Sequence, residues 1–211
     1  MASEVDIANL ALAHLGDTAT VASLNPPEGS AQAEHCARFY PIARDALLEM
    51  FAWGFATRRV QPAALASSTP EWDYAYAMPA DAINIIAVIP PGSSDDYSIG
   101  MISGGAYTPQ AFAREIDARG ADVIYSDQPD AVVRYTAFVT DTTRFPPLFV
   151  MALSWHLASM LAGPILKGDV GAAESKRCAG MMQAYLSQAS ESDANQRLVK
   201  PQHNVGWITG R

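Results

Sequence analysis

Apolar residues recur at helical spacing near both ends of the chain and at strand spacing in its middle. Spacings of three and four residues predict helices over residues 3–15 and about 30–53, because positions so spaced share one face of a helix. The same spacing returns over about residues 146–162, after Phe145, and again over residues 170–190. The pattern therefore predicts two helices on each side of a central region of another kind.

Residues at the ends of these segments support the helices. Ser3 and Ser30 stand where an N-cap is expected, and Gly16 follows the first segment as a C-terminal stop. Pro41 lies inside the second segment, where its missing N–H predicts either a kink near residues 37–41 or a neighbour that satisfies the freed carbonyl.

The two later helices have boundaries of their own. Pro146 or Pro147 begins the third helix, and the Gly163–Pro164 pair is expected to break it. Asp169 is the expected N-cap of the fourth helix.

From residue 55 the apolar period shortens toward two. β-branched and aromatic runs separated by Pro, Gly, Asp and Ser clusters predict strands. The stretch GSSDDYSIGMISGGAYTPQ is polar and rich in glycine, which predicts a loop or hairpin insertion. The strand-like runs are FATRRVQPAAL, WDYAYAMP, AINIIAVIPP, DVIYSD and AVVRYTAFV.

Together these elements predict an α+β fold, with an antiparallel helical bundle from both chain ends and a β-rich domain inserted between the second and third helices. We expect residues 1–54 and 146–195 to form the helical bundle domain. Residues 55–145 form the predicted β-rich insertion domain, and residues 196–211 form a C-terminal docking tail.

The third helix is apolar enough to raise the question of a membrane. The chain has no charged residue between Arg144 and Lys167. However, the uninterrupted stretch before Gly163 is shorter than the roughly 20 residues that a membrane span requires, and it contains polar residues such as Ser154 and His156. We expect a buried core or inter-subunit helix.

The composition of the chain narrows the range of possible functions. The chain has 211 residues, 49% of them hydrophobic and 17% charged, which is enough for one large domain or two small ones. The formal net charge of −8 argues against a protein that grips nucleic acid through phosphates. The segment from Ser67 to Asp130 contains ten Asp or Glu residues but only two Arg. This acidic middle segment and its more balanced flanks are therefore expected to have different neighbours.

The N-terminus suggests a protein that is not exported by a signal peptide. Glu4 and Asp6 stand where such a peptide would be positively charged. Cys36 and Cys178 lie in separate helical patterns without a CxxC pair, so we interpret them as reduced core thiols, with a disulfide as the alternative.

No pattern of catalytic, metal-binding or cofactor-binding residues emerges. There is no GxSxG motif, no P-loop and no dinucleotide-binding glycine pattern. Asp95 and Asp96 adjoin each other but lack the alternation of a calcium loop. His14 and His156 are expected to be core or interface residues hydrogen-bonded to backbone carbonyls. We therefore expect no enzyme activity and no cofactor.

An aromatic stretch marks the end of the second helix. Phe51, Trp53 and Phe55 are expected to bury their rings at a seam between helix and sheet, and Gly54 gives the chain room to turn. Arg58 and Arg59 project to opposite sides of the following strand. One can face acids of its own domain or a neighbouring subunit, while the other faces solvent or a channel; an ordinary surface pair is the alternative.

The C-terminal tail is basic and carries an apolar anchor. It contains Arg197, Lys200 and Arg211 but no acid, together with Trp207 and Ile208. Such a tail is either a mobile solvated terminus or a segment that docks on a partner.

Three segments in order resemble the tail tubular protein A family of phage head-to-tail adaptors. The features are a helix that ends in an aromatic cluster, a YAYAMP strand closing on Asp81, and an aromatic strand leading through FPPLF into a long apolar helix. The likeness extends over nearly the whole chain to the closing WITGR, although the loop at residues 91–109 matches no family pattern. The segments are FYPIARDALLEMFAWGFATRRVQPAAL, WDYAYAMPADAINIIAVIP and VVRYTAFVTDTTRFPPLFVMALSWHLASMLAGPI.

This resemblance implies a structural protein of the virion, assembled in the host cytoplasm and located at the head–tail interface. Family members form a ring, commonly a dodecamer, that binds the portal and carries the tail nozzle or a tail tubular protein B-like component. DNA passes through the lumen without specific binding. The alternatives are a head-completion or tail-terminator ring protein and a small hydrolase with its site in the acidic insertion.

Overall fold

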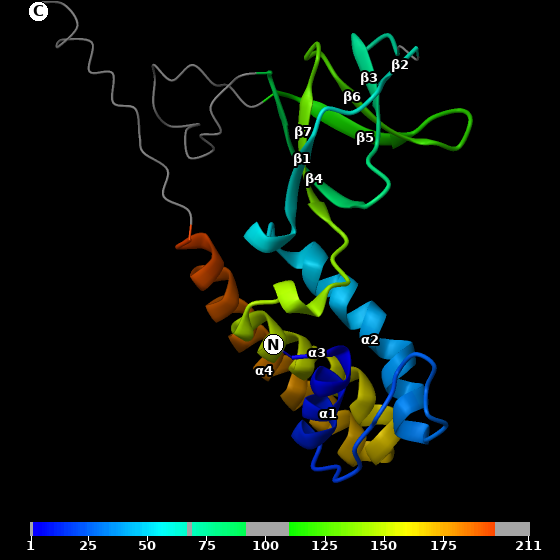
Figure 1. The fold of residues 1–211 in the computed structure, drawn as a ribbon, viewed down its shortest axis with the longest axis vertical. Coiled ribbons are helices and arrows are strands. Elements are labelled where there is room, and N and C mark those ends of the chain that lie inside the picture. Colours follow the sequence, from blue (N-terminus) through cyan, green and yellow to red (C-terminus); the bar gives the residue numbers. More distant parts are fainter. Residues whose placement is uncertain (1, 67–68, 92–109, 197–211) are drawn as a thin grey trace, which may run out of the picture. The chain divides into compact units, whose positions relative to one another are not determined.

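The computed structural model describes residues 2–66, 69–91 and 110–196 (Figure 1). The chain divides into two compact units. The first, here called the helical unit, comprises Met1–Phe55 and Phe138–Gln196. The second, the β unit, comprises Ala56–Ala137 and is grouped with Arg197–Arg211, which lie outside the described residues.

The helical unit contains four α-helices: α1 (Glu4–His14), α2 (Ala31–Met50), α3 (Pro147–Leu166) and α4 (Gly168–Ala194). Short 3-10 helices, η1 (Gly54–Ala56) and η2 (Thr142–Arg144), stand near its chain boundaries. The predicted N-caps of α1 and α2 are confirmed. The Ser3 side chain accepts from the Asp6 amide in a capping box, and the Ser30 side chain accepts from the amide of Ala33.

Helix α3 is the centre of the helical unit, because α1, α2 and α4 each pack against it. Helices α1 and α2 share only a small contact with each other. By length and composition alone, α3 could cross a membrane, because its most apolar 18-residue window has a mean hydropathy of 1.6. Half of that window is buried in the structure, and Phe149, Leu153, Leu157 and Leu161 have no exposed surface. Packing within the protein therefore accounts for much of its apolar character.

The predicted fold class is wrong and is corrected by the structure. The described chain is α+β, with four α-helices and two antiparallel sheets, and its elements follow in the order α1, α2, seven strands, α3, α4. The helices gather around α3 instead of forming the antiparallel bundle that we expected. The physical reason is that α3 is apolar on all sides, whereas a bundle helix has one apolar stripe.

Several helix boundaries also differ from the prediction. Helix α3 continues through Gly163 and Pro164 and ends at Leu166, because a proline in the last turn removes only one backbone bond. Helix α4 begins at Gly168 after Lys167, so Asp169 lies in its first turn instead of capping it. Helix α2 runs through Pro41 and ends at Met50, before the aromatic stretch and earlier than the predicted end near residue 53.

The β unit contains two antiparallel sheets, with strand orders β1-β7-β4 and β2-β3-β6-β5. Side chains from both sheets form one core, in which Tyr76, Val88, Ile124, Val133 and Tyr135 are buried. The strands are β1 (Thr57–Val60), β2 (Ala64–Leu65), β3 (Tyr74–Ala77), β4 (Ala82–Ile89), β5 (Phe112–Ile116), β6 (Asp122–Ser126) and β7 (Val132–Ala137).

Strand β5 was not among the predicted strands. It lies at an edge of its sheet, pairs only with β6 among the named strands, and exposes Arg114, Glu115 and Ile116. An exposed edge strand has no buried face to impose alternation, so the period-two pattern is weak there. The polar stretch before it, residues 92–109, lies outside the described residues.

Candidate interaction sites

The aromatic stretch after α2 packs within the helical unit, against the beginning of α3. The Trp53 ring meets Phe149 edge to face, with centroids 5.1 Å apart, and the Phe55 ring meets Phe149 at 5.0 Å and Phe145 at 5.8 Å. Phe51 stands edge to face with Trp53 at 5.0 Å. Trp53 is 1% exposed, and its indole N–H donates to the Leu47 carbonyl at 2.8 Å. This arrangement gives the stretch a fixed position beside α3.

Gly54 joins this cluster to the end of α4. Its backbone N–H donates to Oδ2 of Asp193 at 2.8 Å. A Cβ at position 54 would lie 3.3 Å from both carboxylate oxygens, so a larger residue would push Asp193 aside. The aromatic stretch and the last turns of α4 are thus held together by one charge-assisted hydrogen bond.

A pocket of about 280 Å³ opens beside this bond. Trp53, Phe149 and residues 146–148 at the start of α3 form its apolar wall. Asp193, in the last turn of α4, and Gln196, just after that helix, form its polar side. Neither Asp193 nor Gln196 was singled out from the sequence, because their role depends on a fold that brings residues 53 and 193 together.

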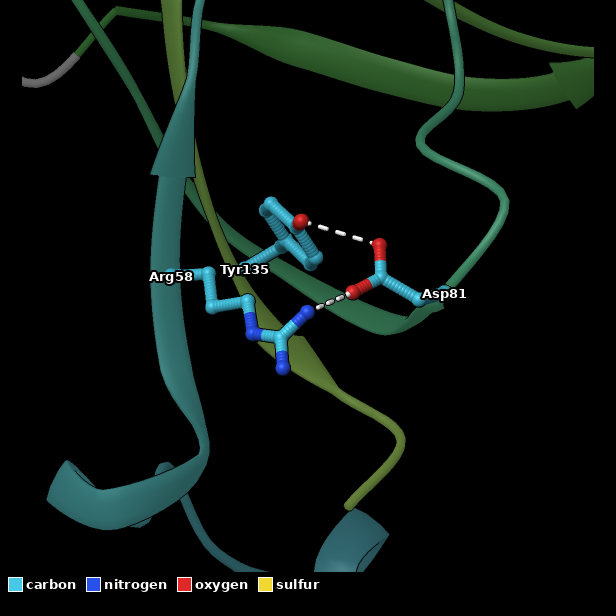
Figure 2. A network of polar contacts seen from close by, with 3 residues as sticks. All are labelled: Arg58, Asp81 and Tyr135. Atoms are coloured by element: carbon cyan, nitrogen blue, oxygen red, sulfur yellow. Dashed lines mark hydrogen bonds and ion pairs between the residues drawn. The ribbon is translucent and has the colours of Figure 1, made fainter. Parts of the chain in front are cut away.

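Arg58 faces an acid of its own unit (Figure 2). Its Nη1 lies 2.5 Å from Oδ2 of Asp81, and the Tyr135 hydroxyl donates to Oδ1 of the same carboxylate at 2.9 Å. The three residues come from β1, from the turn before β4, and from β7. Burial raises the pKa of Tyr135, and its hydrogen bond to Asp81 raises it further. The arrangement ties the two outer strands of one sheet to its centre.

Arg59 stands directly opposite Arg134 in the β1–β7 register. Arg134 is buried, with 7% of its surface exposed, whereas Arg59 is exposed. The two adjacent arginines therefore have different surroundings: Arg58 pairs with Asp81, whereas Arg59 lies across the strand pair from Arg134.

His14 forms a stacked group with residues of α3 and α4. Its ring lies 3.6 Å from the Trp155 ring at an interplanar angle of 6°, and its Nε2 is 3.1 Å from Oγ of Ser154. The Arg177 guanidinium lies 5.3 Å from the Trp155 ring centre and donates to the His14 carbonyl at 2.9 Å. Burial, and secondly the charge of Arg177, lower the pKa of His14.

The Ser154–His14 contact is a packing feature and not a nucleophile–base pair. Ser154 is fully buried, and its hydroxyl donates to the Met151 carbonyl at 2.9 Å. The expected backbone bond is not found at the His14 ring, whose side-chain partner among the described residues is Ser154. At His156, burial lowers the pKa and an interaction with the Ala43 backbone opposes that shift. The ring Nδ1 of His156 is buried without a hydrogen-bond partner among the described residues.

The described residues contain no group of three His, Cys, Asp or Glu side chains that could hold a metal ion. Cys36 and Cys178 are both free and buried, which confirms the interpretation as reduced core thiols. Burial raises the pKa of Cys36 to about 11 and also raises that of Cys178. Asp95 and Asp96 lie outside the described residues, as do all five tail residues singled out from the sequence: Arg197, Lys200, Trp207, Ile208 and Arg211.

No protein-family model matches the chain, and no curated protein matches it either. The resemblance to phage adaptors therefore rests on the sequence segments themselves.

Proposed function

We propose that this chain is a structural virion protein, a phage head-to-tail adaptor without catalytic activity. Its copies form a ring, with twelve as the expected number, that joins the portal to the tail nozzle and forms part of the DNA ejection channel. The C-terminal tail is the proposed portal-docking element. The proposal starts from the sequence resemblance and draws its structural support from exposed apolar surface.

The observation that carries the proposal is an apolar stripe on α2. Ile42 and Met50 are 54% and 51% exposed, and the half-buried Phe39 and Ala46 continue the same stripe at spacings of three and four residues. Single exposed apolar residues are ordinary, but a row along two turns or more of a helix is typical of a surface that another chain covers. A ring subunit requires such a surface.

The charge of the chain is compatible with a DNA conduit. A net charge of −8 provides no general attraction for phosphates, so DNA that passes through a ring of such subunits is not retained. In addition, the Asp81 carboxylate neutralises the charge of Arg58 within the β unit, which leaves this arginine less available to DNA phosphates.

The decisive measurement is the mass of the purified protein in solution, alone and mixed with its portal ring, by light scattering coupled to size exclusion. A ring-sized species in either condition supports the proposal and shows whether assembly needs the portal. A monomer that ignores the portal contradicts it. Changing Ile42 to Ser should reduce the ring-sized fraction, and Glu34→Ser on an exposed position of the same helix is the matched control.

A further inference from the structure

The solvent-facing side of α2 is apolar along one line. Ile42 and Met50 are 54% and 51% exposed, and the half-buried Phe39 and Ala46 complete the apolar stripe. At about 100° of rotation per residue, these four positions lie within about 80° around the helix. The ring of His35 stacks on that of Phe39, with centroids 6.4 Å apart, and helps to hold it in place. The stripe therefore runs without a break along about three turns of α2.

Charged residues line one edge of the stripe, and the sign of the nearest charges changes along the helix. Measured around the helix from Ile42, Arg38 lies at about 40° and Glu49 at about 20° on the same side. Asp45 and Glu34 lie further round, at about 60° and 80°. Arg38 and Glu49 are exposed, and the ion pairs among the described residues do not include Arg38. The charges nearest the stripe are thus a base in the first half of α2 and an acid in the second half.

This face complements its own copy when two α2 helices pack antiparallel about a two-fold axis at Ile42. Each helix rises about 1.5 Å per residue, so residues whose numbers add up to about 84 come level with each other. Phe39 then lies opposite Ala46, a large side chain against a small one. Arg38 comes within about 5 Å of Glu49 of the other copy, measured along the helix axis. Parallel packing would instead set each charge against its own like, which is unfavourable.

We propose that α2 binds α2 of a second copy of this chain, antiparallel, with Ile42 of both copies at the two-fold axis and each Arg38 beside Glu49 of the other copy. A second copy is the occupant because the face is self-complementary in shape and charge, as a two-fold interface requires. Two helices that meet along about three turns bury less surface than a standard interface, so the dimer should dissociate in the micromolar range.

The dimer does not depend on the proposed adaptor function. A two-fold contact closes on itself and yields a dimer, so it cannot by itself build a ring. The dimer is therefore the form of the chain before it meets the portal, and in the proposed ring a neighbouring subunit covers the same stripe instead. Until then the dimer keeps the apolar stripe out of water.

Disulfide trapping of the full-length chain tests the two-fold geometry. Under mild oxidation Ile42→Cys should give a covalent dimer, because the two substituted positions meet at the axis. Met50→Cys is the matched control: position 50 is nearly as exposed, at 51% against 54%, but its two copies lie about 24 Å apart along an antiparallel pair. The native cysteines are buried. Equal yields for the two variants, or more dimer from Met50→Cys, overturn the inference.

Charge reversal tests the contact between Arg38 and Glu49, with sedimentation equilibrium as the measurement. Arg38→Glu alone or Glu49→Arg alone should raise the dissociation constant of the dimer about tenfold, because like charges then meet at both symmetric contacts. An equimolar mixture of the two variants should recover the original constant, since every contact again joins a Glu to an Arg. Lys176→Glu, at an exposed position of α4, changes the net charge as Arg38→Glu does and should leave the constant unchanged. No recovery in the mixture, or an equal effect of Lys176→Glu, overturns the inference.

Light scattering with and without the portal ring separates this inference from the proposed function. A chain that stays monomeric alone, well above micromolar concentration, but forms a ring with the portal refutes the dimer and supports the adaptor function. A dimer that ignores the portal supports this inference and refutes the adaptor function.

Discussion

Gly171 of α4 lies so close to α3 that a Cβ at this position would be 2.8 Å from the carbonyl oxygen of Ala162. The contact stands just after the Lys167 connection, where the two helices begin to run beside each other. Buried positions then recur along α4 at Cys178, Met182 and Ala189. Gly171 thus sets the spacing at which the whole α3–α4 pair packs.

Changing Gly171 to Ala should destabilise the protein, because the new methyl group meets backbone that cannot move independently. The expected loss is about 1–3 kcal/mol of the free energy of unfolding, as for other overpacked sites. Gly180→Ala is the matched control in the same helix, where a Cβ meets nothing within 4 Å. It should stabilise by about 0.5–1 kcal/mol. Urea unfolding of both variants measures the difference, and equal midpoints would contradict the close packing.

Changing Lys167 to Gly should stabilise the connection between α3 and α4. Lys167 has φ +57° and ψ 164°, a backbone conformation that is essentially restricted to glycine. Relief of this strain is expected to be worth about 1 kcal/mol after the entropy cost of glycine is subtracted. Thermal unfolding measures it; a lower melting temperature would contradict the assignment of strain.

Stability should fall as the pH drops below about 6.5, because burial lowers the pKa of His14 and His156 from this ordinary value. A histidine with a lowered folded-state pKa binds its proton less readily than the unfolded chain does, so its contribution is complete above pH 6.5 and is lost as the pH falls toward the folded-state pKa. Urea midpoints across this range measure the slope. His14→Gln should reduce the slope, and an unchanged slope would exclude His14 as a contributor.

The Arg58–Asp81 pair should contribute little to stability. The side chains of Arg58 and Asp81 are 47% and 36% exposed, so Arg58→Ala should cost less than about 1 kcal/mol, and high salt should diminish the effect. Tyr135→Phe should cost about 1 kcal/mol because it removes a hydrogen bond to the same carboxylate. A double-mutant cycle of these two changes measures their coupling. A loss of several kcal/mol for Arg58→Ala would show that the pair is more than a surface contact.

Deleting residues 197–211 should leave the fold intact and abolish attachment to the portal. A folded domain usually tolerates truncation of a short segment of this composition at its boundary, so the circular dichroism spectrum and the melting temperature should remain close to those of the full chain. Co-sedimentation with the portal ring measures attachment. Retained attachment would refute the role given to the tail.

Local features of the fold could be predicted because they depend on residues close together in the sequence. Ser3 and Ser30 cap their helices through bonds to amides three residues away. Six of the seven described strands lie within the five runs that the period-two pattern had indicated, from Thr57 to Ala137, because alternation marks strands with a buried face. The burial of Cys36, Cys178 and His156 also followed from apolar helical surroundings.

Only the tertiary structure decided which elements meet. The Gly54–Asp193 bond joins residues 139 positions apart, and the His14–Ser154 contact joins residues 140 positions apart. The gathering of three helices around α3, which overturned the predicted bundle, depends on the same long-range packing. A periodic pattern shows which face of an element is apolar but not which other face covers it, since many apolar faces are chemically alike. That choice is made by shape and close packing when the whole chain folds.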